Sequence, residues 1–93
     1  MTENDQNQIE LWISHGKYQQ ALENFISFEK IRSLSDDEIL TKKLAQIYIY
    51  LDKGEFHNGV KIADEMIKEA QLQDNKLREI DAILGKLENI ICE

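Results

Sequence analysis

The sequence predicts an all-α domain of five helices that pair as antiparallel hairpins. Three observations predict it. The chain of 93 residues contains no proline and only four glycines, which favours a few helices joined by short connections. Apolar residues recur at spacings of three and four along most of the chain. The chain also repeats itself at a distance of 38 residues, measured from the glycine corner at Gly16 to the one at Gly54.

The first two helices are expected at about residues 6–15 and 18–32. In the first, Ile9, Trp12 and Ile13 share one face, and Gly16 ends the helix in the left-handed conformation that glycine adopts easily. The second helix carries a broader apolar stripe that forms a large part of the expected core. The stripe consists of Tyr18, Ala21, Leu22, Phe25 and Phe28.

The third helix is expected at about residues 36–53. Ser35 followed three residues later by Glu38 is a capping-box pattern that marks its start. From Leu44 to Leu51 only Gln46 is strongly polar, and a helix that is apolar nearly all round is surrounded by others. A buried strand over 47–51 is the alternative, but its flanks are charged and helical and no partner strand exists.

Gly54 ends the third helix, and the last two helices are expected at about residues 56–72 and 75–91. Asp74 and Asn75 supply the cap of the fifth helix. Gly85 lies inside this helix, where glycine costs roughly 1 kcal/mol relative to alanine, so it indicates close contact with a neighbouring helix. The apolar face of the fifth helix consists of Leu77, Ile80, Ile83, Leu84, Leu87 and Ile90 or Ile91.

The two corners and their flanks resemble the tetratricopeptide repeat family. The first copy has Trp12, Gly16, Tyr18, Ala21 and Phe25 at the family's spacing, and the second has Tyr50, Gly54, Phe56, Gly59 and Ala63. The resemblance covers about residues 6–91 and implies a right-handed array of about two and a half repeats. The chain departs from the family in its period, which is 38 rather than about 34 residues, and in lacking the proline that often closes a unit.

The resemblance implies a concave groove, lined by the first helix of each unit, that holds a peptide or a helix of another protein. The groove candidates are Gln6, Glu10, Ile13, Thr41, Leu44, Tyr48 and Leu51. The alternative is that Leu44, Tyr48 and Leu51 are core residues that contact the fifth helix or the first hairpin. The cations with which some family members grip a chaperone's terminal carboxylate are absent from the matching positions, so that ligand is not expected.

Charge and composition exclude several classes of partner. The net charge of −7 disfavours binding to nucleic acid and to anionic membranes. No apolar run approaches the roughly 18 residues of a membrane-spanning helix. The single Cys92 forms no internal disulfide, and the acidic, polar residues 1–5 are unlike a signal peptide. We therefore expect a cytoplasmic protein.

Catalytic, metal and cofactor sites are not expected. His15 and His57 stand singly beside helix-ending glycines, outside any metal-binding spacing. Cys92 has no basic neighbour that lowers its pKa. The acids at 36–38 are explained by the positive end of a helix. The pattern therefore predicts a protein that is not an enzyme.

Three functions remain open. The first is a small adaptor or chaperone that binds a peptide or amphipathic helix of a partner protein, as secretion chaperones with this fold do. The second is a structural module that self-assembles into a homo-oligomer. A half repeat leaves an open C-terminal face on the fifth helix near Leu84, Leu87 and Ile91, which a partner or a second copy covers. The third is the sensor fragment of a peptide-responsive bacterial regulator.

Overall fold

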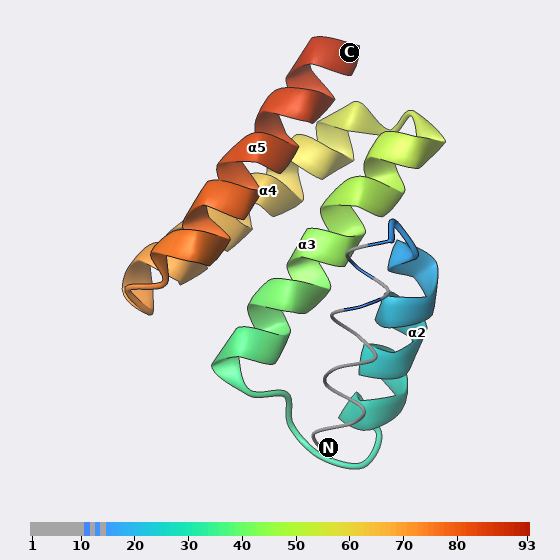
Figure 1. Ribbon diagram of the computed structural model, residues 1–93, viewed down its shortest axis with the longest axis vertical. Helices are drawn as coiled ribbons and strands as arrows, with labels where there is room; N and C mark the ends of the chain where they lie inside the picture. Colours follow the sequence, from blue (N-terminus) through green and yellow to red (C-terminus); the bar gives the residue numbers. More distant parts are fainter. Residues whose placement is uncertain (1–10, 12, 14) are drawn as a thin grey trace.

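The structure is a computed structural model that describes residues 11, 13 and 15–93. Four helices follow one another along this part of the chain (Figure 1). They are α2 (Tyr18–Glu29), α3 (Asp36–Lys53), α4 (Phe56–Leu72) and α5 (Lys76–Cys92). The described residues contain no strand, so the all-α prediction is confirmed and the alternative strand at 47–51 is wrong.

The expectation of a five-helix array with two and a half repeats is wrong, because the described chain holds four helices. Most of the expected helix at 6–15 lies outside the described residues. Of this segment, Leu11 and Ile13 are described and are helical, and the N–H of His15 donates to the carbonyl oxygen of Leu11 at 3.1 Å. The second helix also ends at Glu29 rather than near residue 32. Ile31 is 83% exposed, so no packing extends the helix that far.

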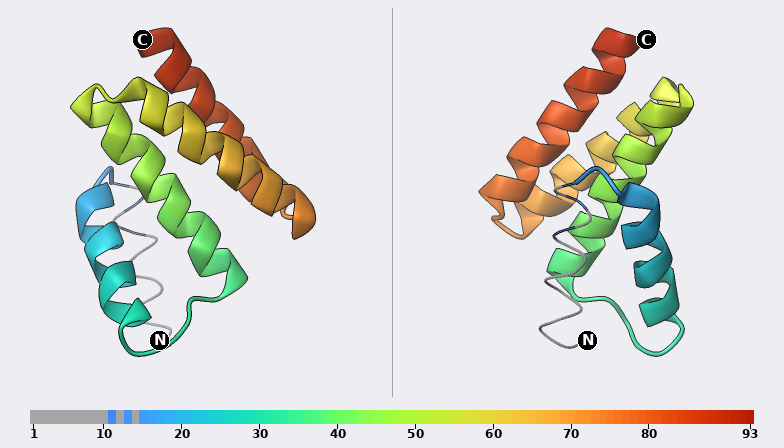
Figure 2. Two further views of the ribbon diagram at one scale, coloured as in Figure 1. Left: turned by 180° about the vertical axis from the view of Figure 1, so that it is seen from behind. Right: turned by 45° about the vertical axis from the view of Figure 1, so that its right-hand side comes forward.

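Helix α3 lies at the centre of the structure, as its nearly continuous apolar sequence predicts. It contacts α2, α4 and α5. Helix α2 packs along one side of α3, while the antiparallel pair α4 and α5 covers the other side (Figures 1 and 2). The main core therefore forms where α3 meets α4 and α5. Its buried residues are Leu40, Leu44, Ile47, Ala63, Met66, Ala70 and Ala82.

A smaller cluster joins α2 to the rest of the structure. Ala21 and Phe25 are buried there, and Phe28, Leu34 and Ile13 pack against them. Of the stripe expected for this helix, only these two residues are fully enclosed. Tyr18, Leu22 and Phe28 are half-buried, so the contribution of α2 to the core is smaller than its sequence suggests.

The glycine corners have the conformation that the sequence predicts. Gly54 is the C-terminal cap of α3, with φ of 75°, and its N–H donates to the carbonyl oxygen of Leu51 at 3.1 Å. Gly16 has nearly the same left-handed φ of 74°. A side chain at either position would be strained, which explains why both corners use glycine.

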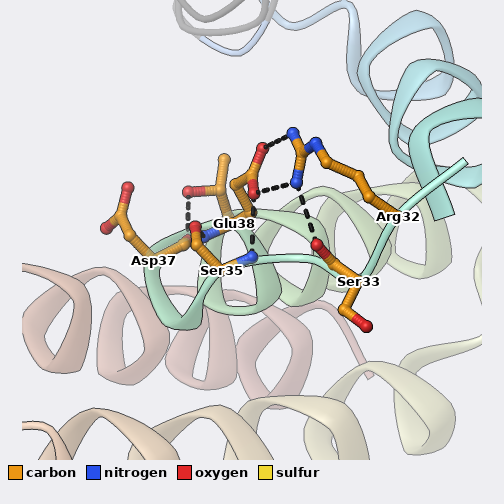
Figure 3. Close-up of polar contacts among 6 residues, drawn as sticks. Arg32, Ser33, Ser35, Asp37 and Glu38 are labelled. Atoms are coloured by element: carbon orange, nitrogen blue, oxygen red, sulfur yellow. Dashed lines mark hydrogen bonds and ion pairs between the residues drawn. The ribbon is translucent and has the colours of Figure 1, made fainter. Parts of the chain in front are cut away.

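The connection from α2 to α3 is fixed by one carboxylate. Glu38 accepts hydrogen bonds from both terminal nitrogens of Arg32, at 2.9 and 2.8 Å, and from the backbone N–H of Ser35 at 2.8 Å (Figure 3). Its own N–H donates to Ser35 Oγ at 3.2 Å, which completes the predicted capping box. The Arg32 guanidinium, with help from Ser35, lowers the pKa of Glu38 from 4.5 to about 2.

Candidate functional site

The inward side of α5 is built from small and polar residues. Ala82, Gly85 and Asn89 are buried, and they follow one another at spacings of three and four. At Gly85, an added Cβ would lie 2.7 Å from Cγ2 of Ile47 on α3. At Gly59 on α4, an added Cβ would lie 2.2 Å from Oδ1 of Asn89. The two glycines therefore bring α5 very close to α3 and α4, and the close contact predicted at Gly85 is confirmed.

Asn89 is the polar residue inside this contact. It is fully buried, and its Nδ2 donates to the carbonyl oxygen of Gly85 at 2.8 Å. Its Oδ1 has no hydrogen-bond partner within the described chain and lies against Gly59. The one hydrogen bond of this amide stays inside α5, so Asn89 meets α4 through the close packing of its side chain on Gly59.

The outward side of α5 carries its large aliphatic side chains. We call this set the outer stripe, and each member is between 40% and 80% exposed. Five of them recur at spacings of three and four, the pattern of a coiled-coil seam, and Ile83 and Ile90 widen one edge. The outer stripe consists of Leu77, Ile80, Ile83, Leu84, Leu87, Ile90 and Ile91.

Helix α5 thus has an unusual division between its two sides. An amphipathic helix on a protein surface ordinarily buries its large apolar residues and exposes its polar ones. Here the small side packs on the molecule and the large apolar side faces solvent. Together the exposed fractions of the outer stripe equal about four fully exposed aliphatic residues, and burying each is worth about 1.5–3 kcal/mol. This stabilisation is gained only when another molecule covers the outer stripe, so α5 is the candidate binding element.

Charged residues border the outer stripe and are partly neutralised. Arg78 donates from Nη1 to Asp81 Oδ2 at 3.2 Å, and Lys86 Nζ lies 2.8 Å from Asp64 Oδ1 on α4. Asp81 and Glu88 stand seven residues apart, so both lie along one edge of the stripe. Glu88 is exposed, and no ion pair joins it to a cation of the described chain.

Two tyrosines lie next to this acidic edge. The rings of Tyr18 on α2 and Tyr48 on α3 are stacked, with centroids 4.9 Å apart and planes inclined by 15°. Burial and then the negative charge of Glu88 raise the pKa of Tyr48 to about 12. The same two causes raise the pKa of Tyr18. Both hydroxyls therefore stay protonated at neutral pH, and Tyr48 connects the centre of α3 to the edge of α5.

The predicted groove residues occupy different environments. Gln6 and Glu10 lie outside the described residues. Thr41 is buried and donates from Oγ1 to the carbonyl oxygen of Asp37 at 2.9 Å, and Leu44 is buried in the main core. Ile13, Tyr48 and Leu51 are half-buried, and Ile13 packs against both core clusters. The described groove candidates thus line the inside of the structure more than its surface.

The predicted open-face residues do lie together on the surface. Leu84, Leu87 and Ile91 are 50%, 47% and 80% exposed and belong to the outer stripe. The sequence predicted one apolar face that contains these three residues and the rest of the stripe, without assigning the side of the helix that packs. The small residues at 82, 85 and 89 were the signal for that side, because they mark where a neighbour approaches closely.

A surface hollow of about 600 Å³ lies between α2, α3 and α4. Three cations line it, which suggests an anion site at first sight. Each cation already has an acidic partner that an incoming anion would have to displace. The pairs are Arg32 with Glu38, Lys42 with Glu29, and Lys43 with Glu65.

Among the described residues, no three His, Cys, Asp or Glu side chains gather closely enough to hold a metal ion. Within the same residues, no helix has the length and apolar character needed to cross a bilayer. No protein-family model matches this chain, and neither curated proteins nor solved structures provide a match.

Proposed function

We propose that this chain is a protein-interaction module that binds an amphipathic helix of a partner protein on the outer stripe of α5. The observation that carries the proposal is the inverted orientation of α5, whose small residues face the molecule and whose large aliphatic residues face solvent. Exposed apolar patches of this extent mark interaction surfaces on soluble proteins. The one cysteine and the lack of an internal disulfide support a cytoplasmic setting.

The spacing of the outer stripe supports a helix as the ligand. Leu77, Ile80, Leu84, Leu87 and Ile91 supply the alternating three and four spacing into which the side chains of a second helix fit. The stripe lies on a helix rather than on a sheet edge, so strand addition is not available. An adaptor or a small chaperone that shields an apolar helix of its partner fits this surface.

Self-assembly is the second candidate function, and the same spacing favours it. Leucine and isoleucine at both seam positions also suit pairing between two copies of α5. Light scattering on the purified chain separates the candidates, because the self-assembling module alone has a mass of two or more times 10.9 kDa. The Leu84→Glu/Leu87→Glu variant should return such an assembly to a monomer.

The proposed function is tested by comparing what the wild type and two variants retain from the native host. Leu84→Glu/Leu87→Glu places two charges in the outer stripe, while Ile31→Glu places one at an aliphatic position that is 83% exposed outside α5. We expect partners that copurify in stoichiometric amounts with the wild type and the control but not with the stripe variant. Equal retention by all three proteins contradicts the proposal. Circular dichroism melts confirm that each variant is folded.

A further inference from the structure

We propose that the helix bound on the outer stripe is basic, with lysine or arginine along the edge that faces Asp81 and Glu88, and that it belongs to a different protein rather than to a second copy of this chain. This inference rests on the proposed function and specifies the chemistry of the partner. It follows from the different character of the two edges of the stripe and from the net charge of the chain.

The two edges of the outer stripe differ in charge. One edge carries Asp81 and Glu88, each next to a leucine or isoleucine of the seam. The other edge begins with Lys76 at the start of α5 and is then widened by Ile83 and Ile90. A helix that fills the seam therefore lies against carboxylates on one side and aliphatic groups on the other. Its complement is a helix with cations along one side only.

Glu88 is the strongest determinant on the acidic edge. Asp81 is already paired with Arg78 at 3.2 Å. Glu88 has no cationic partner within the described chain, and its negative charge raises the pKa of Tyr48. A lysine or arginine of the ligand would neutralise this carboxylate at the border of an apolar contact. There the pair is less screened than on an open surface.

A second copy fits the same edges poorly. In an antiparallel pair of α5 helices, equivalent edges meet, so Asp81 of one copy approaches Glu88 of the other. A parallel pair brings Lys76 to Asp81 but sets Glu88 against Ile83. Each copy also carries a net charge of −7, which opposes association of like molecules over a longer range. A basic partner replaces the approach of like carboxylates by attraction to Asp81 and Glu88, and the net charge of this chain attracts it.

The test uses the full chain and two designed helical peptides with the same leucine and isoleucine seam. One peptide has lysine at all flanking positions, and the other has glutamate there. We expect the lysine peptide to bind about tenfold more tightly in fluorescence anisotropy at low salt, the size of a few exposed charge pairs. Raising the salt concentration should shrink this preference.

Matched protein variants localise the effect. Glu88→Gln and Glu23→Gln change the net charge equally, but Glu23 lies on α2, away from the stripe. Glu88→Gln should remove at least half of the binding free-energy difference that favours the lysine peptide, and Glu23→Gln should leave that difference unchanged. If both variants reduce the preference equally, only the overall charge matters and the assigned edge is wrong.

The remaining outcomes separate the inference from the proposed function. Equal binding of both peptides overturns the basic partner and leaves the helix-binding function standing. Binding of neither peptide by a monomeric chain overturns both. A dimer that Leu84→Glu dissociates identifies a second copy as the occupant, which overturns this inference and supports the self-assembly function.

Discussion

The contact between Gly59 and Asn89 leads to the sharpest prediction. In Gly59→Ala, the new Cβ would lie 2.2 Å from Asn89 Oδ1 and 2.5 Å from its Cγ, where ordinary contacts begin near 3.4 Å. The atoms must separate by about 1 Å. Asn89 is fully buried and held by its bond to Gly85. Either α4 and α5 move apart or the amide gives up this hydrogen bond.

The magnitude of this effect combines three terms. Overpacking of a close contact costs about 1–3 kcal/mol, and loss of the amide hydrogen bond adds about 1 kcal/mol. Replacing a helical glycine by alanine returns about 1 kcal/mol. We therefore expect Gly59→Ala to lower the free energy of unfolding by about 1–3 kcal/mol. Asn58→Ala, at an exposed neighbouring position of α4, should change it by less than about 0.5 kcal/mol.

A double-mutant cycle tests the reasoning by urea unfolding followed with circular dichroism. Asn89→Ala removes the amide that clashes with the methyl group introduced by Gly59→Ala, so Gly59→Ala should be nearly neutral or stabilising in that background. The coupling free energy should be about 1–3 kcal/mol in the direction of rescue. Two results would refute the reasoning. One is additivity within about 0.5 kcal/mol. The other is a Gly59→Ala variant that is more stable than the wild type.

Three further predictions concern the interior of the protein. Gly85→Ala should lower the free energy of unfolding by about 1–2 kcal/mol because its Cβ meets Ile47 Cγ2 at 2.7 Å. Adding Ile47→Leu, which lacks that branch, should restore at least half of the lost free energy in urea unfolding. The low pKa of Glu38 stabilises the folded state above its ordinary pKa of 4.5, so acid titration should lose about 1–3 kcal/mol between pH 4.5 and about 2; a Glu38→Gln variant with an equally steep loss contradicts this. The raised pKa of Tyr48 contributes stability that is fully present below pH 10, and this contribution is lost as the pH rises toward 12. Tyr48→Phe should therefore lose less stability over that range, and tyrosinate absorbance should lack one late titration step.

The sequence predicts helix ends well where a chemical marker stands. The bounds of α3 and α4 agree with those predicted, because Ser35 and Glu38 form a capping box and Gly54 closes α3 in the left-handed conformation. The end of α2 was predicted too late. No cap marks that end, and the helix stops where its side chains cease to be buried, which depends on the tertiary structure.

The orientation of α5 was harder to predict. Periodicity shows that one side of a helix is apolar, but it does not show which side meets the neighbouring helices. The small side of α5 packs because Gly59 and Gly85 permit an approach that larger side chains forbid. Gly85 alone indicated close contact, but its partner Ile47 and the role of Asn89 depend on residues distant in sequence.

The two sides of α5 also have a consequence for how this chain can change over generations. The residues that hold the helix in place are Ala82, Gly85 and Asn89, and the residues that face outward form a separate set. A substitution between Leu, Ile, Met and Val in the outer stripe therefore alters the surface shape and leaves the inward contacts of Ala82, Gly85 and Asn89 as they are. Selection can therefore change the shape of this exposed surface without first passing through an unstable protein.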